Sequence, residues 1–372
     1  MPQFSDLLER LADIDPASEL AQARAQRQAA TQHAQGSYDV LFSEDDDDFP
    51  LQERIALAAQ VASWHGSARL EAHYKQLLKR PPGGAKFTAA QAFARLLSQH
   101  PVDAAPEHIH DLQNAGWTPR GIVTLAQLIA FVSFQSRLLA GFRLLNGEQT
   151  AEQPQAVAGK WHDAPRTASG KTALTAFTQQ ELGWEPWLAA DPLSAFSSDE
   201  QAVLKKNGHS DSDYFRLLAL HLPLLEQRTL TDKGIFYTSG RLSRAERELT
   251  ATVVSKVNGC IYCASVHARK ASQLSKDDAA VQKLLNVSPG ADLAQGQSAR
   301  WAAIINLAAT LSVTPAATNL QQLQTLRDQG LDTLELLDVI HSAAFFAWAN
   351  RLMLTLGEPF LVEQPKGYQN KE

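Results

Sequence analysis

Two cysteines are the most reactive side chains in this sequence, and they lie close together. The chain of 372 residues contains only 2 Cys, Cys260 and Cys263, both within the stretch VNGCIYCASVHARKASQL. His267 follows the second cysteine by four residues. A Cys-x-x-Cys pair can form a reversible disulfide or bind a metal ion. The spacing therefore indicates thiol redox chemistry or a metal site.

The segment before the cysteines predicts how they are presented. Ser243 and Glu246 have the spacing of a capping box, which predicts a helix over about 244–257. Asn258-Gly259 is typical of a helix end, because both residues tolerate the left-handed conformation. A second helix should follow, with Cys260 in its first turn. Free backbone N–H groups and the helix dipole at that position would favour a thiolate.

Helical spacing also brings an acid and a base to the cysteines. On the second helix Cys260, Cys263 and His267 share a face at i, i+3 and i+7. Glu248 lies ten residues before Asn258, and His267 lies nine residues after it. If the helices fold back as a hairpin, these two side chains reach a similar height. The sequence therefore predicts a relay from Glu248 through His267 to Cys263.

A zinc site is the main alternative, because Cys, His and Glu are all zinc ligands. Structural zinc usually draws its ligands from separate segments, whereas three of these four donors lie on one helix face. Redox chemistry is the favoured interpretation, and neither a metal nor a cofactor is predicted.

The sequence also repeats itself. An ungapped shift of 214 aligns Gly116 with Gly330, Pro101 with Pro315 and many neighbours. The matched stretches TPRGIVTLAQLIAFVSFQSRLL and DTLELLDVIHSAAFFAWANRLM both predict helices. We find no alternating pattern that predicts strands. The predicted fold class is all-α, with a first helical domain at 1–147, a linker at 148–171 and a second helical domain at 172–372.

The first domain lacks the thiols of the second. A shift of 194 aligns His73 with His267, but it places Gly66 and Arg69 at the two cysteine positions. We therefore expect a degenerate first domain that completes an oligomer or shapes the pocket.

Composition restricts the partners and the location. The net charge is −6 and the pI about 6.0, which argues against nucleic acid and anionic membranes as partners. The most apolar run, 122–132, is too short to cross a bilayer. The N-terminal residues do not have the pattern of a secretory signal, so a cytoplasmic location is expected. The acidic run at 44–48 is typical of a solvated segment and lacks the pattern of a calcium loop.

The motif resembles a known family. Glu248, eleven residues, Cys260-Ile-Tyr-Cys263, three residues and His267 together resemble the signature of the AhpD-like alkylhydroperoxidases of the carboxymuconolactone decarboxylase superfamily. The stretches LSRAEREL, VNGCIYCASVH and AAFFAWANRLMLTLGEP resemble its peroxidase-related branch, over about 230–359. This resemblance implies two tandem AhpD-like helical domains, of which the first is degenerate. It also implies that Cys263 is the peroxidatic cysteine, that Cys260 resolves it, and that Glu248 and His267 relay protons.

The expected function is therefore a thiol-dependent peroxidase. It would reduce organic hydroperoxides or hydrogen peroxide, would be reset by an external dithiol of unknown identity, and would assemble as a homo-oligomer. A redox-sensing or disulfide-exchange protein is the alternative.

Four further positions bear on this interpretation. AhpD itself has histidine where this chain has Tyr262. His341 is interpreted as a core histidine, and Arg137 and Arg351 as structural residues.

Overall fold

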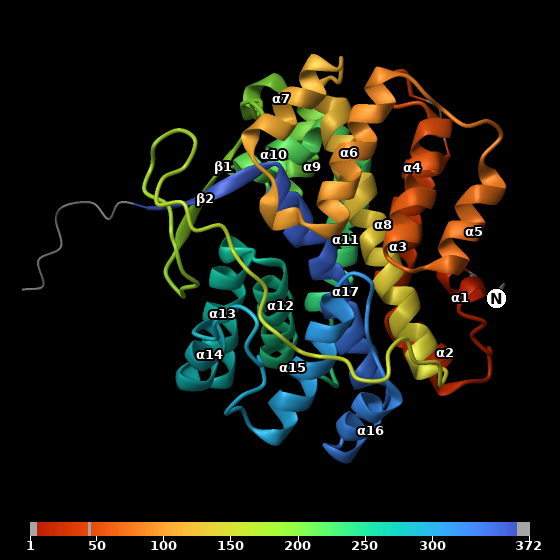
Figure 1. Ribbon diagram of the computed structural model, residues 1–372, viewed down its shortest axis with the longest axis vertical. Helices are drawn as coiled ribbons and strands as arrows, with labels where there is room; N and C mark the ends of the chain where they lie inside the picture. Colours follow the sequence, from red (N-terminus) through yellow and green to blue (C-terminus); the bar gives the residue numbers. More distant parts are fainter. Residues whose placement is uncertain (1–5, 44–45, 363–372) are drawn as a thin grey trace, which may run out of the picture.

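The computed structural model describes residues 6–43 and 46–362, and within them helices are the main secondary structure (Figure 1). The elements up to the end of the first copy are α1 (Leu7–Leu11), α2 (Glu19–Gln26), α3 (Gln28–Phe42), α4 (Leu51–Trp64), α5 (Ala68–Leu77), α6 (Ala85–Gln99), η1 (Pro101–Asp103), α7 (Pro106–Asn114) and α8 (Pro119–Leu145). The remaining elements are β1 (Leu182–Pro186), η2 (Leu193–Ala195), α9 (Ser198–Asn207), α10 (Asp213–Leu218), η3 (Ala219–His221), α11 (Leu222–Phe236), α12 (Arg244–Asn258), α13 (Ile261–Ser275), α14 (Asp278–Leu285), α15 (Ala299–Ser312), α16 (Leu320–Asp328), α17 (Thr333–Thr355) and β2 (Gly357–Leu361). The predicted all-α class is confirmed.

The helices repeat in the same order in the two halves of the chain. Adding 214 to the bounds of α7 gives 320–328, which are the bounds of α16, and α6 and α8 shift in the same way onto α15 and α17. Adding 194 to the bounds of α3 gives 222–236, which are the bounds of α11, and α4 and α5 shift onto α12 and α13. The two shifts differ by 20 residues because α14 and its loops lie between α13 and α15.

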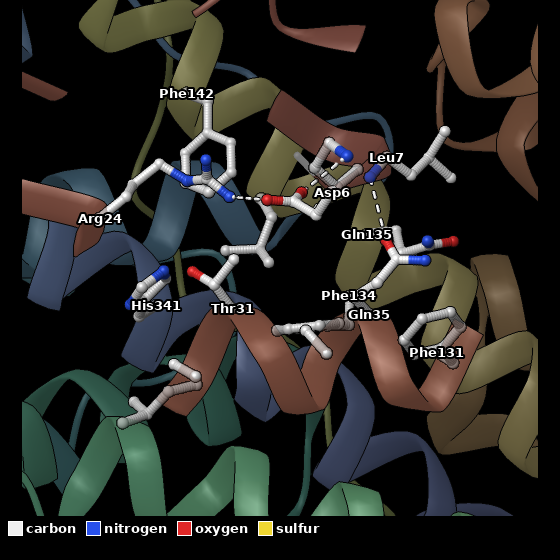
Figure 2. Close-up of a pocket in the computed structure, with 15 residues that line it drawn as sticks. Asp6, Leu7, Arg24, Thr31, Gln35, Phe131, Phe134, Gln135, Phe142 and His341 are labelled. Atoms are coloured by element: carbon white, nitrogen blue, oxygen red, sulfur yellow. Dashed lines mark hydrogen bonds and ion pairs between the residues drawn. The ribbon is translucent and has the colours of Figure 1, made fainter. Parts of the chain in front are cut away.

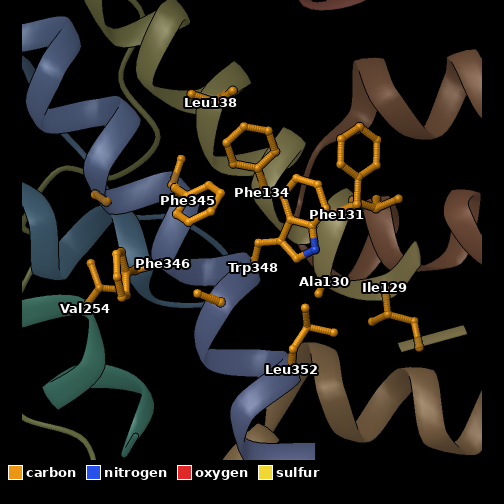
Figure 3. Close-up of a cluster of buried hydrophobic side chains, with 14 of the residues drawn as sticks. Ile129, Ala130, Phe131, Phe134, Leu138, Val254, Phe345, Phe346, Trp348 and Leu352 are labelled. Carbon is orange, nitrogen blue, oxygen red and sulfur yellow. The ribbon is translucent and has the colours of Figure 1, made fainter. Parts of the chain in front are cut away.

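The two copies meet along α8 and α17, which pack against each other at the centre of the molecule (Figure 1). Phe131 and Phe134 of α8 contact Trp348 of α17, with ring centroids 5.1 and 5.5 Å apart (Figure 3). The indole Nε1 of Trp348 donates a hydrogen bond to Gln127 Oε1 at 2.8 Å. Both helices are apolar on all sides because both are surrounded by protein.

Helix α8 extends the predicted apolar run 122–132 at both ends. By length and composition α8 could cross a membrane, but its apolar stretch is 100% buried among the other helices. This burial is typical of the core helix of a globular protein.

Two buried arginines join the copies where α8 and α17 pass the ends of the neighbouring helices. Arg137 Nη2 donates to Ser312 O at 2.8 Å, and Arg351 Nη2 donates to Ser98 O at 3.0 Å. Ser98 and Ser312 are themselves 214 residues apart, so the two contacts are reciprocal. Burial lowers the pKa of both guanidiniums, to about 9 for Arg351. The carbonyl ends of α6 and α15 favour these cations, which confirms the predicted structural role.

A long connection links the copies and covers part of the second one. It lies against the end of α12, where Gly159 N donates to Lys256 O at 3.1 Å, and it then leads to β1, which pairs with β2 (Figure 1). The strands are antiparallel, with Leu182 opposite Leu361. The expectation that the chain contains no strands is wrong here, because these five-residue strands are too short to show alternation. Trp184 anchors this ribbon to α17, since it is buried and its Nε1 donates to Met353 O at 3.1 Å.

The division into domains at 1–147, 148–171 and 172–372 stays a prediction. A single hydrophobic core includes side chains from both copies, so packing alone does not separate them. The acidic run lies partly outside the described residues, which omit Glu44 and Asp45. Its later members Asp46 and Asp48 contact Arg120 at 2.6 and 3.4 Å.

Gly259 should be one of the least replaceable residues of this fold. Its φ of +77° is left-handed, and an added Cβ would lie 2.3 Å from Lys160 O. Gly290 has a similar φ of +78° but open space around it. We expect Gly290→Ala to lose roughly 1–2 kcal/mol of stability from backbone strain alone. Gly259→Ala should lose clearly more, because the connection must also move, and urea unfolding of both variants measures the difference. Equal losses of stability in the two variants would show that the connection moves aside without a cost in free energy.

Candidate active site

The cysteines lie at the bend of a helical hairpin formed by α12 and α13. The capping box of Ser243 and Glu246 begins α12, as predicted. Gly259 ends this helix in the left-handed conformation, and α13 starts two residues later at Ile261. Cys260 is therefore the N-cap residue of α13, and Cys263 lies in its first turn. The two helices pack against each other along their length.

The hairpin brings Glu248 of α12 against His267 of α13. His267 Nδ1 forms a short hydrogen bond with Glu248 Oε2, while Arg244 Nε donates to Glu248 Oε1 at 2.6 Å. Burial opposes ionisation of this carboxyl group, but His267 and then Arg244 outweigh it and lower the pKa of Glu248 to about 2. Glu248 is thus a buried carboxylate that fixes the imidazole. The ring of His267 also packs edge-on against Phe346, with centroids 4.4 Å apart.

Both cysteines are free thiols and both are almost fully buried, at 2% exposure for Cys260 and 5% for Cys263. The thiol of Cys260 lies within hydrogen-bonding reach of Cys263 and of Asn350. The sequence predicted a lowered pKa for a cysteine in the first turn of α13. For Cys260 this prediction is wrong, because burial first, and the bond to Cys263 second, raise its pKa well above the usual value.

Asn350 is a site residue that the sequence analysis missed. It lies fully buried on α17, where its Nδ2 donates to Ser255 Oγ at 3.1 Å and its Oδ1 accepts from Asn258 Nδ2 at 3.0 Å. These bonds tie the end of α12 to the central helix beside Cys260. The feature of the sequence that could have identified Asn350 is its amide side chain within a run of apolar residues.

A second missed group lies on α11. The guanidinium of Arg228 lies 5.1 Å from the ring centroid of Phe345 and 5.9 Å from that of Tyr214. Burial raises the pKa of Tyr214. The charge of Arg228 lowers this pKa, and that of Cys263 raises it, but both effects are smaller than that of burial. Asp232, one turn after Arg228, has a raised pKa because its desolvation outweighs the attraction of Arg228 and His267. The feature of the sequence that could have identified this group is the oppositely charged i, i+4 pair of Arg228 and Asp232 in a buried helix.

A pocket lies beside the bend of the hairpin, and Cys260 is one of the residues that line it. One wall comes from the first copy, through Val102, Ala105 and Pro106. The remaining lining includes Tyr262 and Met353 of the second copy. The first copy therefore shapes this pocket directly. Cys263 does not line it, although the two cysteines are neighbours.

The equivalent region of the first copy has no thiols. His73, which aligns with His267, bonds instead to the hydroxyl of Tyr38 at 2.8 Å. Arg69, at the position of Cys263, forms an ion pair with Asp13. These contacts are structural in kind.

His341 lies away from the cysteines, in a cavity lined by Arg24 and Phe142 (Figure 2). It is 3% exposed, and burial lowers its pKa to about 3, as in a neutral core histidine. Within residues 6–43 and 46–362, no group of three His, Cys, Asp or Glu side chains is arranged to hold a metal ion.

The helical hairpin with the cysteines lies in a segment that matches a known protein family. The Carboxymuconolactone decarboxylase family matches residues 223–305, which include α12, α13 and both cysteines. No curated protein matches the chain. Among solved structures, the chain is similar to the crystal structure of the alkylhydroperoxidase AhpD core, an uncharacterized peroxidase-related protein from Ralstonia eutropha JMP134. That match has 19% identity and a TM-score of 0.37, and it covers 44% of this chain and 86% of the other. The matched segment of the second copy, which includes Glu248, Cys260, Cys263 and His267, is thus similar to the Carboxymuconolactone decarboxylase family.

Proposed function

We propose that the protein is a thiol peroxidase that reduces organic hydroperoxides or hydrogen peroxide through a dithiol–disulfide cycle of Cys260 and Cys263. The observation that carries the proposal is the bond between Glu248 and His267. It fixes an imidazole one helical turn from Cys263, as a general base next to a nucleophile requires. The family match over 223–305 supports the same chemistry.

His267 has one nitrogen available for proton transfer. Glu248 is ionised, so it accepts the Nδ1–H of His267 and leaves Nε2 free to take the thiol proton of Cys263. The thiolate attacks the O–O bond, forming a sulfenic acid on Cys263 and releasing the alcohol, or water from hydrogen peroxide, after proton return. Arg244 strengthens this arrangement by holding the second oxygen of Glu248.

Cys260 suits the second step. Its raised pKa keeps it as a thiol, so Cys263 is oxidised first. The thiol of Cys260 then condenses with the sulfenic acid, which forms the disulfide and releases water. Asn350, within reach of the Cys260 sulfur, orients it toward its partner.

The cycle requires an external dithiol, which we propose as the reductant, and a reducing compartment such as the cytoplasm. A redox-sensing or disulfide-exchange protein would use the same two thiols. Steady-state kinetics with organic hydroperoxides and a dithiol separate these functions. Many turnovers per minute favour the peroxidase, and a single stoichiometric oxidation favours the sensor.

The two cysteines should differ when each is replaced. One equivalent of peroxide should remove two hydrogens from the wild-type protein by forming the disulfide. Cys260→Ser should instead gain one oxygen as a trapped sulfenic acid, and Cys263→Ser should consume peroxide at less than about a hundredth of the wild-type rate. Intact-protein mass spectrometry and peroxide consumption measure both effects. Wild-type consumption by Cys263→Ser would assign the nucleophile to another residue.

Replacing Glu248 should affect both activity and acid stability. Glu248→Gln should slow oxidation of Cys263 by roughly 10- to 100-fold, because His267 loses its anionic partner. The folded pKa of about 2 lies below the ordinary value of 4.5, so Glu248 stabilises the fold above pH 4.5 and this contribution disappears as pH falls toward 2. The loss should be of order 3 kcal/mol in the wild type and absent in the variant.

Stopped-flow oxidation and urea unfolding between pH 2 and 5 measure the two effects of Glu248→Gln. Glu226→Gln, a half-buried position on α11, is the control and should retain the wild-type rate and pH slope. An unchanged oxidation rate in Glu248→Gln would remove this carboxylate from the relay.

The assembly state follows from the proposed family membership and from the duplication. The two copies already pair within one chain through α8, α17, α3 and α11. We propose that these pairs assemble further into a homo-oligomer. Light scattering on the purified protein should give a multiple of the chain mass of 40.7 kDa. A monodisperse monomer would contradict this proposal.

A further inference from the structure

The two sulfurs of the cysteine pair face different surroundings, and this difference bears on how the proposed disulfide is reduced. Cys260 is one of the residues that line the pocket, whereas Cys263 is not, and Cys263 lies one turn from His267. The side chain of His267 is 16% exposed, which leaves a second approach to the site from its side. Only one of the two cysteines therefore lines the pocket.

The pocket is built from several separate parts of the chain. Ala105 comes from the first copy, Ala164 from the connection, and Trp187 from the segment after β1. Most of the lining is apolar, so an uncharged, partly apolar molecule fits it. Glu358 supplies a carboxylate, whose Oε1 accepts bonds from Ala168 N at 2.8 Å and Trp187 Nε1 at 3.0 Å.

Disulfide exchange distinguishes the two sulfurs. The incoming thiolate attacks one sulfur, and the other leaves as a thiolate, with the lower-pKa thiol leaving faster. Burial raises the pKa of the Cys260 thiol, so its thiolate is a poor leaving group. Cys263 can leave beside His267, whose imidazole returns the proton. Both access and leaving-group chemistry therefore direct attack to Cys260.

We propose that this pocket is the access route of the reductant, and that the reductant is an uncharged thiol or dithiol. This inference rests on the proposed peroxidase cycle. The reductant thiolate attacks Cys260 Sγ, the bond to Cys263 breaks, and Cys263 leaves as a thiolate. A second thiol then attacks the reductant sulfur of the mixed disulfide, releasing oxidised reductant and the Cys260 thiolate, which takes a proton. The degenerate first copy thus selects the reductant, while the peroxide reaches Cys263 from the side of His267.

Filling the pocket should separate the two halves of the cycle. Ala105→Trp and Ala164→Trp narrow it from two different segments, and His110→Trp places the same side chain on the exposed face of α7 as a control. Circular dichroism checks the fold of each variant. Because Ala164 lies in an irregular segment, its variant tests the proposal even if Ala105→Trp does not fold.

Single-turnover kinetics measure each half-reaction. Reduction of the disulfide by 2-mercaptoethanol should slow at least tenfold in both pocket variants and remain normal in His110→Trp. Oxidation by hydrogen peroxide or cumene hydroperoxide should stay within about twofold of wild type in all three. Slower oxidation with normal reduction would overturn the proposal and make the pocket the peroxide site. Normal rates in both half-reactions would overturn it as well.

The disulfide can also be prepared with diamide, which keeps this test independent of peroxidase activity. If peroxide fails to oxidise the cysteines, the proposed function fails, but reduction of the diamide-formed disulfide still reports on the pocket. The mixed disulfide should be trapped on Cys260 in Cys263→Ser treated with an activated disulfide of 2-mercaptoethanol. Peptide mapping of that adduct, and its loss in the pocket variants, give a second readout.

Charge provides a further measurement of the same site. 2-Mercaptoethanol and 2-mercaptoethanesulfonate are similar in size, but only the second is anionic. After normalisation to a small-molecule disulfide, the anionic thiol should react at least fivefold more slowly with the wild type. Glu358→Gln keeps the acceptor for Ala168 and Trp187 and should reduce that difference. If the two thiols differ in rate as much with Glu358→Gln as with the wild type, the anionic thiol does not pass Glu358.

Discussion

The packing of α8 against α17 is the constraint on which the rest of the structure depends. Each helix is buried on nearly every side, so neither could be stable in water without the other. Aromatic rings fill their contact, with Phe131, Phe134 and Phe345 around Trp348. Helices α4 and α6 pack against α8, and α11, α12 and α15 pack against α17, so the two copies share one core.

This central pair also fixes the distance between the copies, and the cysteine site depends on that distance. Arg137 and Arg351 each reach across to the carbonyl end of a helix in the other copy. The residues that follow α6 are thereby held against the hairpin of α12 and α13. Val102 packs beside Gly259, so close that a Cβ on this glycine would lie 2.8 Å from Val102 Cγ2. A copy without thiols thus forms part of the wall around the thiols of the other copy.

Burial explains the electrostatics of the site. Glu248 is fully buried yet ionised, because His267 and Arg244 both contact its carboxylate. Cys260 is just as deeply buried but lacks a cationic partner, so its pKa rises. The same desolvation has opposite outcomes in these two residues because only one of them has positive charge within reach.

The sequence determined the parts of this protein that depend on local spacing. The capping box, the left-handed Gly259 and the i, i+4 spacing of Cys263 and His267 are local signals, and they predicted the hairpin and the meeting of Glu248 with His267. The ungapped shift of 214 predicted the repeat of α6 to α8, because duplicated helices keep their apolar pattern. Tertiary structure decided what depends on packing between distant segments. Asn350 lies beside Cys260 only because α17 passes the hairpin. The pocket exists only because 102–106 folds onto Gly259. The pKa of Cys260 rises because the effect of burial there exceeds the effect of the helix terminus. Such contacts leave no pattern in the sequence, since their residues are separated by up to about 250 positions and meet only when the core forms.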